Sequence, residues 1–154
     1  MGDTQKELLK AVKRGNVELI RRVLSSFMVD VNFRTERVLN EAALLVHLRG
    51  HIKIINESPL ILAAKEGHKD VVQLLLERGA EPNLAHQNGL TPLHCAALQG
   101  YKDVVQFLLE GGAEPNLAHQ NGRTPLQMAA SIGHTDVVQL LLDSGAGPNM
   151  PHLN

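Results

Sequence analysis

The sequence predicts an all-α repeat solenoid, in which pairs of antiparallel helices stack along one axis. Three observations lead to this fold class. A nine-residue segment that begins at Gly89 returns 33 residues later at Gly122, with Thr-Pro-Leu and Ala-Ala in the same places. A weaker copy begins at Ser58, which lies 33 residues before Thr91. A second apolar segment at helical spacing follows each copy, and a period of this length is typical of stacked supersecondary units.

Composition narrows the class of protein. The 154 residues suffice for one ordinary domain, and the balance of 44% apolar to 20% charged residues is that of a soluble globular protein. The formal net charge of −1 disfavours nonspecific binding to nucleic acid or to an anionic membrane, because such binding needs a broad basic surface. The single cysteine, Cys95, has no partner for an internal disulfide, which fits a reducing compartment.

Targeting and membrane segments are not recognisable. Residues 1–25 carry charges throughout and lack the apolar core of a signal peptide. No apolar run reaches the roughly 20 residues that a membrane helix requires. We therefore expect a soluble intracellular protein, most simply a cytoplasmic one, and the nucleus and delivery into a host cell stay open as alternatives.

The N-terminal part, residues 1–32, is predicted to be a capping repeat with two short helices within residues 4–24. Apolar residues at helical spacing mark one face of each helix, and Gly15 and Asn16 separate the two. Basic side chains gather on the opposite face of the first helix, namely Lys6, Lys10, Lys13 and Arg14. A terminal repeat needs a polar outer face for solubility, although the same side chains could form a basic docking patch.

Residues 33–57 interrupt the period and form an insertion. Gly15 and Gly67 occupy equivalent positions but lie 52 residues apart instead of 33. Helical spacing from Glu36 to Leu45, followed by alternation of apolar and polar residues over 46–54, predicts a helix and then a small hairpin. The insertion is either a degenerate repeat that fills the stack or a projection that touches the partner.

Three units follow, at residues 58–85, 86–118 and 119–154. The first helix of each begins at a hydroxyl residue followed by proline, which is an N-cap followed by the helical position that favours proline: Ser58, Thr91 and Thr124. It ends at a glycine, where a positive φ costs least: Gly67, Gly100 and Gly133. The second helix has an aspartate in its first turn and ends at Gly-Ala. The connections between units end in Asn-Gly, which predicts projecting turns.

These residues resemble the ankyrin repeat family, whose pattern is a β-turn followed by two antiparallel helices with a T-P-L-H-x-A-A start and a G-H break. The segment from Thr91 to Ala97 carries the start in full. Gly67-His68 and Gly133-His134 carry the break, and Gly100-Tyr101 varies it. The resemblance covers residues 58–147 and reaches the first helix pair through Asp30-Val31-Asn32. It implies an ankyrin-like stack of about four repeats, each a β-turn plus an antiparallel helix pair, in one domain over residues 1–154.

The chain departs from the family pattern at two kinds of position. His86 and His119 stand where the family opens its turn with aspartate. Ile61 and Gln127 replace the motif histidine in the outer copies. The resemblance implies that this histidine is structural and links neighbouring turns. We therefore expect weaker hydrogen bonding between repeats at the two replaced positions, with the fold unchanged.

The sequence predicts neither a catalytic site nor a cofactor or metal site. It contains no phosphate-binding glycine loop, paired cysteine motif or H-E-x-x-H. Cys95 has only its neighbour His94 as a candidate base, and adjacent side chains on a helix point about 100° apart. The other histidines recur with the repeat, which spaces them along the stack instead of around one ion. Few aromatic residues, no tryptophan and no basic stripe disfavour nucleic acid.

Exposed positions that differ between repeats point to a partner surface, because packing positions are the same in every unit. The resemblance implies that the turn tips and the exposed side of the first helix face a concave groove. The implied contact residues are Lys65, Glu66, Gln87, Asn88, Leu90, Leu98, Gln99, Gln120, Asn121, Arg123, Ser131 and Ile132. Among them Leu90, Leu98 and Ile132 predict an apolar strip, with Arg123 at its edge.

Three functions are compatible with this sequence. The favoured one is a non-catalytic scaffold that binds a partner protein or peptide, with no cofactor, no nucleic acid and no membrane. The first alternative is a module that recognises a small ligand or a nucleotide. The second is a targeting fragment of a larger effector or enzyme.

The C-terminal repeat lacks the polar substitutions that a terminal cap needs, because Val137, Val138 and residues 140–142 copy the inner units. Either Met150 to Leu153 fold over this end, the end frays, or the stack associates with itself through it. Fraying predicts low hydrogen-exchange protection after Asp136 compared with residues 91–110.

Overall fold

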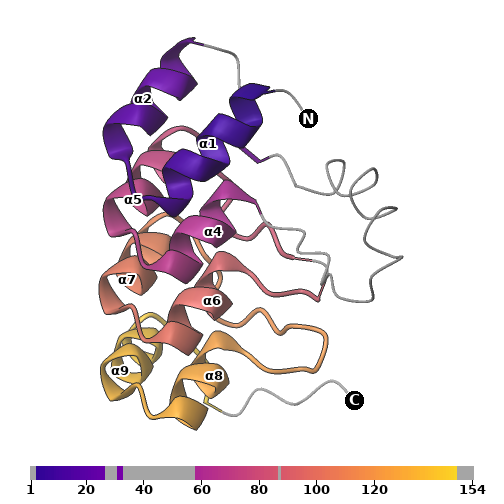
Figure 1. Ribbon diagram of the computed structural model, residues 1–154. Coiled ribbons are helices and arrows are strands. Elements are labelled where there is room, and N and C mark those ends of the chain that lie inside the picture. The colour runs from indigo at the N-terminus through magenta and orange to yellow at the C-terminus, as the bar shows by residue number, and fades with distance from the viewer. Residues whose placement is uncertain (1–2, 27–30, 33–57, 87, 149–154) are drawn as a thin grey trace.

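A computed structural model shows how the chain is arranged (Figure 1). It describes residues 3–26, 31–32, 58–86 and 88–148. The helix and hairpin predicted within residues 33–57 lie outside this part of the chain, and so do Gln87 and the predicted covering segment from Met150 to Leu153.

In the described residues, eight α-helices form pairs that stack in one direction (Figure 1). The pairs are α1 (Asp3–Lys13) with α2 (Val17–Ser26), α4 (Pro59–Glu66) with α5 (Lys69–Glu77), α6 (Pro92–Gln99) with α7 (Lys102–Glu110), and α8 (Pro125–Ile132) with α9 (Thr135–Asp143). The first helices α1, α4, α6 and α8 contact one another in sequence, and the second helices α2, α5, α7 and α9 form a parallel row. The predicted solenoid of helix pairs is confirmed.

The first helix of each later pair begins where the sequence predicts. The side-chain oxygens of Ser58, Thr91 and Thr124 accept a hydrogen bond from the backbone N–H three residues on, and a proline follows each. Each helix then ends at a glycine with φ of 75°, 77° or 91°, in the left-handed region that glycine adopts without strain: Gly67, Gly100 and Gly133. Local capping therefore sets both ends of these short helices.

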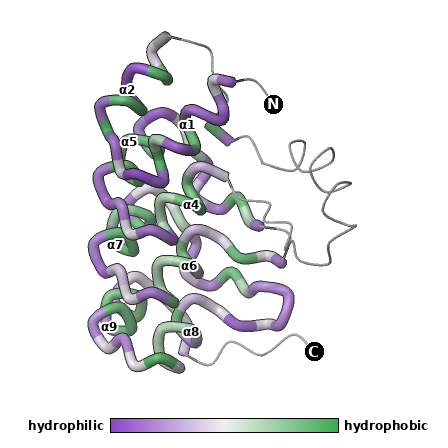
Figure 2. Tube along the Cα trace, viewed as in Figure 1, coloured by the Kyte–Doolittle hydropathy of each residue, from purple (hydrophilic) through white to green (hydrophobic). Residues whose placement is uncertain are grey.

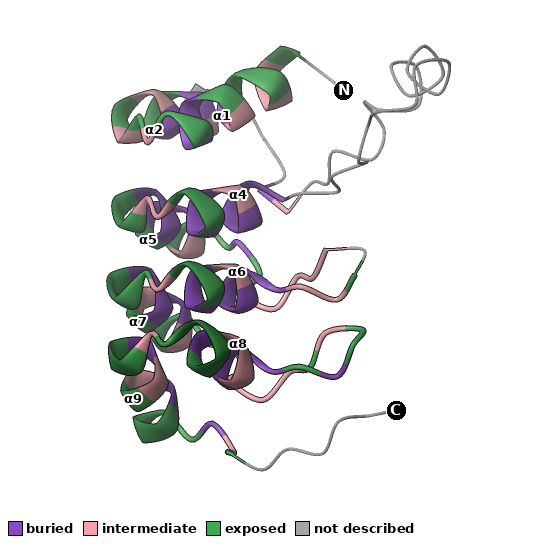
Figure 3. Ribbon diagram, turned by 60° about the horizontal axis from the view of Figure 1, so that its bottom comes forward, coloured by how far each residue is buried: buried purple, intermediate pink, exposed green. Residues whose placement is uncertain are grey.

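The core is a continuous apolar layer between the two rows of helices (Figures 2 and 3). On the first helices, alanines without solvent exposure let the neighbouring backbones approach closely: Ala63, Ala64, Ala96 and Ala97. On the second helices, β-branched and leucine side chains fill the layer, including Val71, Val72, Leu75, Val104, Val105 and Leu108. Each pair buries its apolar side against its neighbours, so stacking supplies the core that one pair lacks.

The first repeat has the polar outer face expected of a cap. Leu8, Ala11 and Val12 of α1 are fully buried. The basic residues of the predicted opposite face are all exposed, namely Lys6, Lys10, Lys13 and Arg14. Gly15, with φ of 64°, separates α1 from α2 as predicted. The exposed face of α1 is therefore basic, and α1 packs against α4.

The last described repeat is more open than the inner ones. A Cβ at Gly100 would lie 2.6 Å from the ring of His134, whereas a Cβ at Gly133 would meet nothing within 4 Å. Ile132 is 58% exposed and Leu142 is 39% exposed. The equivalent inner position to Leu142 is Leu109, which is partly buried against the core. The described C-terminal end therefore presents apolar side chains that an additional repeat would cover.

Candidate partner-binding surface

Two turn segments project from the row of first helices (Figure 1). We call residues 81–90 the first finger and residues 114–123 the second finger. In the first finger, the His86 N–H donates to the Leu90 carbonyl at 2.7 Å, and the Gly89 N–H donates to the His86 carbonyl at 2.8 Å. Arg123 accepts the corresponding bond from His119 in the second finger at 3.0 Å. The turns predicted at Asn-Gly are confirmed.

A histidine ring stabilises each finger from inside its turn. The Asn121 N–H donates to Nδ1 of His119 at 2.9 Å, and the Asn88 N–H donates to Nδ1 of His86 at 3.3 Å. An aspartate carboxylate makes the same local bond to the backbone N–H two residues on. The imidazole therefore replaces the carboxylate as acceptor and keeps the turn closed.

The fingers are also bonded to each other. The Gln120 N–H donates to the Asn88 carbonyl at 3.0 Å. Beside this bond, a Cβ at Gly89 would lie 3.2 Å from the backbone nitrogen of Gln120 and from Cα of His119. Glycine is therefore required at residue 89 both for its φ of 76° and for the close approach of the second finger.

Asparagines hold the bases of the fingers. The Asn83 amide donates to the Gly112 carbonyl at 3.2 Å, and its Oδ1 accepts from the Glu114 N–H at 2.9 Å. Asn32 and Asn116 make the corresponding pairs of bonds to their own following repeats. Sequence reasoning missed this role, although the recurrence of asparagine one period apart at Asn83 and Asn116 was the signal that could have shown it.

His94 connects the helix start to the second finger. Its Nδ1 accepts the Thr91 N–H at 3.2 Å, and its Nε2 lies 3.2 Å from the Arg123 carbonyl, to which it donates. Since Nδ1 is an acceptor, the hydrogen-bond pattern assigns the proton to Nε2. Burial lowers the pKa of His94 to about 4, so the ring is neutral at pH 7. The link to the neighbouring turn implied by the family resemblance is confirmed here.

The two positions that lack this histidine behave differently. Gln127 completes the same capping box, because its Oε1 accepts the Thr124 N–H at 3.0 Å. The side chain of Ile61 is apolar and the residue is only 2% exposed, so this side chain packs without making a hydrogen bond. Within the described residues, only His94 among these three joins its helix to the following finger through its side chain. The expectation of weaker hydrogen bonding agrees with this geometry at Ile61, whereas the turn that would follow Gln127 lies outside the described residues.

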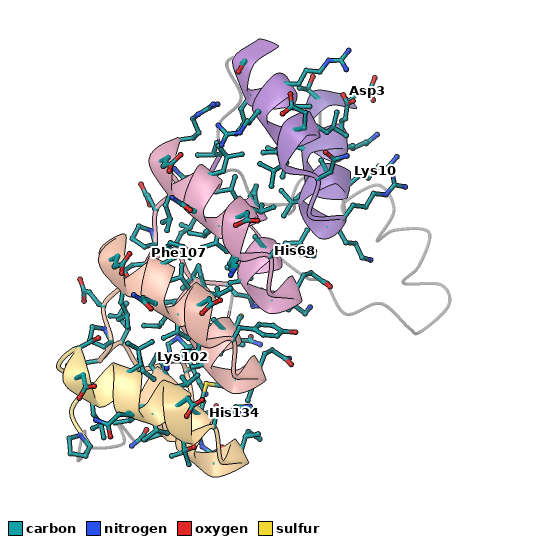
Figure 4. The ribbon with its side chains drawn as sticks, turned by 90° about the vertical axis from the view of Figure 1, so that its left-hand side faces the viewer. Asp3, Lys10, His68, Lys102, Phe107 and His134 are labelled. Carbon is teal, nitrogen blue, oxygen red and sulfur yellow. The ribbon has the colours of Figure 1, made fainter. Side chains whose placement is uncertain are left out.

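A second set of rings lies at the junction between the helices of each pair. His68 and His134 occupy the same edge of the stack (Figure 4), where their Nε2 atoms lie 3.0 Å and 3.1 Å from the carbonyl oxygens of Lys13 and Leu98. Tyr101 takes the intermediate position, with ring atoms 2.9 Å from where a Cβ of Gly67 would lie. Tyr101 is 37% exposed. Tyr101 is not among the predicted contact residues, so the sequence prediction missed the exposure of its ring.

The predicted contact residues fall into two groups. The finger group contains Asn88, Leu90, Gln120, Asn121 and Arg123, and the helix-end group contains Lys65, Glu66, Leu98, Gln99, Ser131 and Ile132. All are exposed except the half-buried Leu90, and Gln87 lies outside the described residues. An eight-residue helix, about 12 Å long, separates the two groups. The exposed large apolar side chains near the helix ends are Leu98, Tyr101 and Ile132.

In the part of the chain that the structure describes, no group of three or more His, Cys, Asp or Glu side chains could hold a metal ion. None of the described helices is long and apolar enough to cross a membrane. Cys95 is half-buried on α6.

The fold and the fingers define a solenoid of helix pairs joined by projecting turns. The family model described as ankyrin repeats in three copies matches residues 3–84 and 60–152. The chain therefore belongs to the ankyrin repeat family, as its motifs indicate. No curated protein matches the chain. Ankyrin repeats generally mediate protein–protein interaction and are typically non-catalytic.

Proposed function

We propose that this protein is a non-catalytic scaffold that holds a partner protein or peptide against the fingers and the exposed side of the first helices. One observation carries the proposal. The helix-end group presents the exposed apolar side chains of Leu98 at 37% and Ile132 at 58%, and Tyr101, directly after α6, adds a third at 37%, on a row of helices whose buried positions repeat. Exposed apolar groups that lie close together are typical of interaction sites.

The chemistry of the partner follows from the two groups. The helix-end group favours an apolar anchor residue on the partner. Arg123 is the only lysine, arginine, aspartate or glutamate among the described residues 82–90 and 115–123. A guanidinium binds a carboxylate through paired hydrogen bonds, so the partner is expected to carry an acidic residue opposite Arg123.

Recognition of a small ligand or a nucleotide is less well supported. Such a site needs basic and aromatic groups together, whereas Arg123 and Tyr101 lie at opposite ends of the first helices. A targeting role within a larger effector or enzyme would use the same surface and the same kind of partner. The half-buried thiol of Cys95 suits the reducing intracellular location that we propose.

Peptide selection tests the proposal. Peptides are selected on the full chain from a random library at pH 7.5, and their dissociation constants are measured by fluorescence polarisation. Replacing Leu98 and Ile132 with alanine is expected to weaken binding at least tenfold, and adding Leu90→Ala tests the finger side of the predicted strip. Leu142→Ala is the matched control, because Leu142 is equally exposed at 39% but lies on α9.

The outcomes separate the functions. Unchanged affinity after the triple replacement of Leu90, Leu98 and Ile132 would show that the surface assignment is wrong. Nucleotide binding measured by calorimetry, with ATP as the probe, would favour the ligand-binding alternative. Circular dichroism of each variant confirms that it is folded.

A further inference from the structure

The fingers carry a titratable acceptor at the point where their shape is determined. In both fingers the ring Nδ1 of a histidine accepts a backbone N–H from the turn, at 2.9 Å for His119 and at 3.3 Å for His86. A neutral imidazole has one acceptor nitrogen, and protonation converts that nitrogen into a donor. The protonated ring then faces the N–H of Asn121 or Asn88 with a donor, and the hydrogen bond is lost.

Loss of this bond affects the binding surface directly. Asn88 and Asn121 belong to the finger group, and the Asn88 carbonyl also accepts the Gln120 N–H that joins the two fingers. A change of the turn at Asn88 therefore reaches the second finger as well. His68 and His134 differ, because their Nε2 atoms face carbonyl oxygens and a protonated ring still donates there.

Two titratable groups face His119 within the described residues. His119 faces the neutral His94 of α6, with ring centroids 5.8 Å apart, and Arg123 of its own finger. Burial, followed by the charge of Arg123, lowers the pKa of His119. One repeat earlier, Ile61 and Leu90 occupy the positions of His94 and Arg123. Glu81 and Glu114 lie at the start of the two fingers, where their backbone N–H groups donate to the side-chain oxygens of Asn32 and Asn83.

We propose that His86 and His119 make partner binding dependent on pH. This inference rests on the proposed function, because it concerns the regulation of the same surface. When the rings are neutral, both fingers are closed and the partner binds; when the rings are protonated, the finger tips open and the partner dissociates. An ordinary histidine changes its charge between pH 5 and 8, and the lowered pKa of His119 moves its protonation towards the acidic end of this range.

Nuclear magnetic resonance of the full chain tests the opening of the fingers without a partner. Ring ¹⁵N shifts assign the tautomer of each histidine and follow its protonation. The expected result is Nε2–H tautomers for His86 and His119, together with loss of Asn88 and Asn121 amide protection at the pH where each ring protonates. His134 is the internal control, because its protonation should leave the Asn121 amide unchanged. Full protection of both amides beside protonated rings overturns the proposal.

The peptides selected at pH 7.5 test the effect on binding. We expect affinity at pH 5.0 to fall about fivefold for each finger bond lost, or about twenty-fivefold for both. The double variant His86→Asp, His119→Asp should bind equally at both pH values, because an aspartate with an ordinary pKa of about 3.9 is still an acceptor at pH 5.0. Equal losses in this variant and the wild type overturn the proposal. Urea unfolding at pH 5.0 excludes global unfolding as the cause.

The two proposals fail in different ways. If alanine at Leu98 and Ile132 leaves peptide affinity unchanged, the proposed surface is wrong. If those replacements weaken binding but the wild type binds equally at pH 7.5 and 5.0, the scaffold function stands and the pH dependence is wrong.

Discussion

The buried His94 predicts a pH-dependent stability that can be isolated by one substitution. Its pKa is about 4 in the folded protein because of burial, against an ordinary value of 6.5. The unfolded chain therefore binds the proton between these values and the folded chain does not. Stability from this group is fully present above pH 6.5, falls as the pH is lowered towards 4, and changes no further below that. The difference between the folded and unfolded pKa values of His94 corresponds to about 3 kcal/mol of unfolding free energy.

The variant His94→Gln provides the comparison, because Gln127 shows that glutamine completes the same capping box. It should be less stable at pH 7.5 by about 1 kcal/mol, from loss of the bond to the Arg123 carbonyl. Urea unfolding is measured for both proteins at pH 7.5, 6.0, 5.0 and 4.0. The other groups titrate similarly in both chains, so the difference between the two stability curves reports His94. Parallel curves across this range would refute the lowered pKa of the buried His94.

Three further predictions concern packing between repeats. Gly100→Ala should destabilise the protein more than Gly133→Ala, as measured by urea unfolding. Both variants place alanine in the left-handed region at a cost of about 1–2 kcal/mol, but only a Cβ at Gly100 meets the His134 ring, at 2.6 Å. Equal losses of stability would contradict this packing. Asn83→Ala should lower the free energy of unfolding by about 2 kcal/mol, because it removes two hydrogen bonds at the base of the finger. A loss below about 0.5 kcal/mol, which is about half of one such bond, would show that water replaces them. Amide hydrogen exchange should be faster after Asp136 than in residues 91–110, whereas uniform protection would exclude fraying of this end.

The sequence was sufficient for the helices because the interactions that set their ends are local. The Thr91 cap reaches three residues along the chain, and the φ of Gly100 is a property of glycine itself. Both are visible as motifs once the period is known. The fold class follows from the period, since one helix pair cannot bury its apolar side alone.

The contacts between repeats were harder to predict, because they join residues that lie nearly one period apart. Asn83 bonds to Gly112, 29 residues away, and His134 bonds to Leu98, 36 residues away. Neither pair forms a recognisable local motif. Recurring polar residues such as asparagine at the finger bases carry the only signal. No motif in the sequence indicates that Tyr101 is exposed, since its exposure depends on how the ring packs over Gly67 in the neighbouring repeat.

The finger geometry also explains why specificity is expected in residues that fail to repeat. Backbone groups close each turn, since the His119 N–H bonds to the Arg123 carbonyl, and backbone groups join the fingers through Gln120 and Asn88. The side chains of Leu90 and Arg123 take no part in these bonds. They can differ in charge and size at little cost to the stack, whereas the asparagines and glycines around them cannot, and the histidine positions need a hydrogen-bond acceptor. Partner recognition can therefore diverge at these positions while the scaffold stays the same, and a histidine acceptor adds sensitivity to pH without changing the turn.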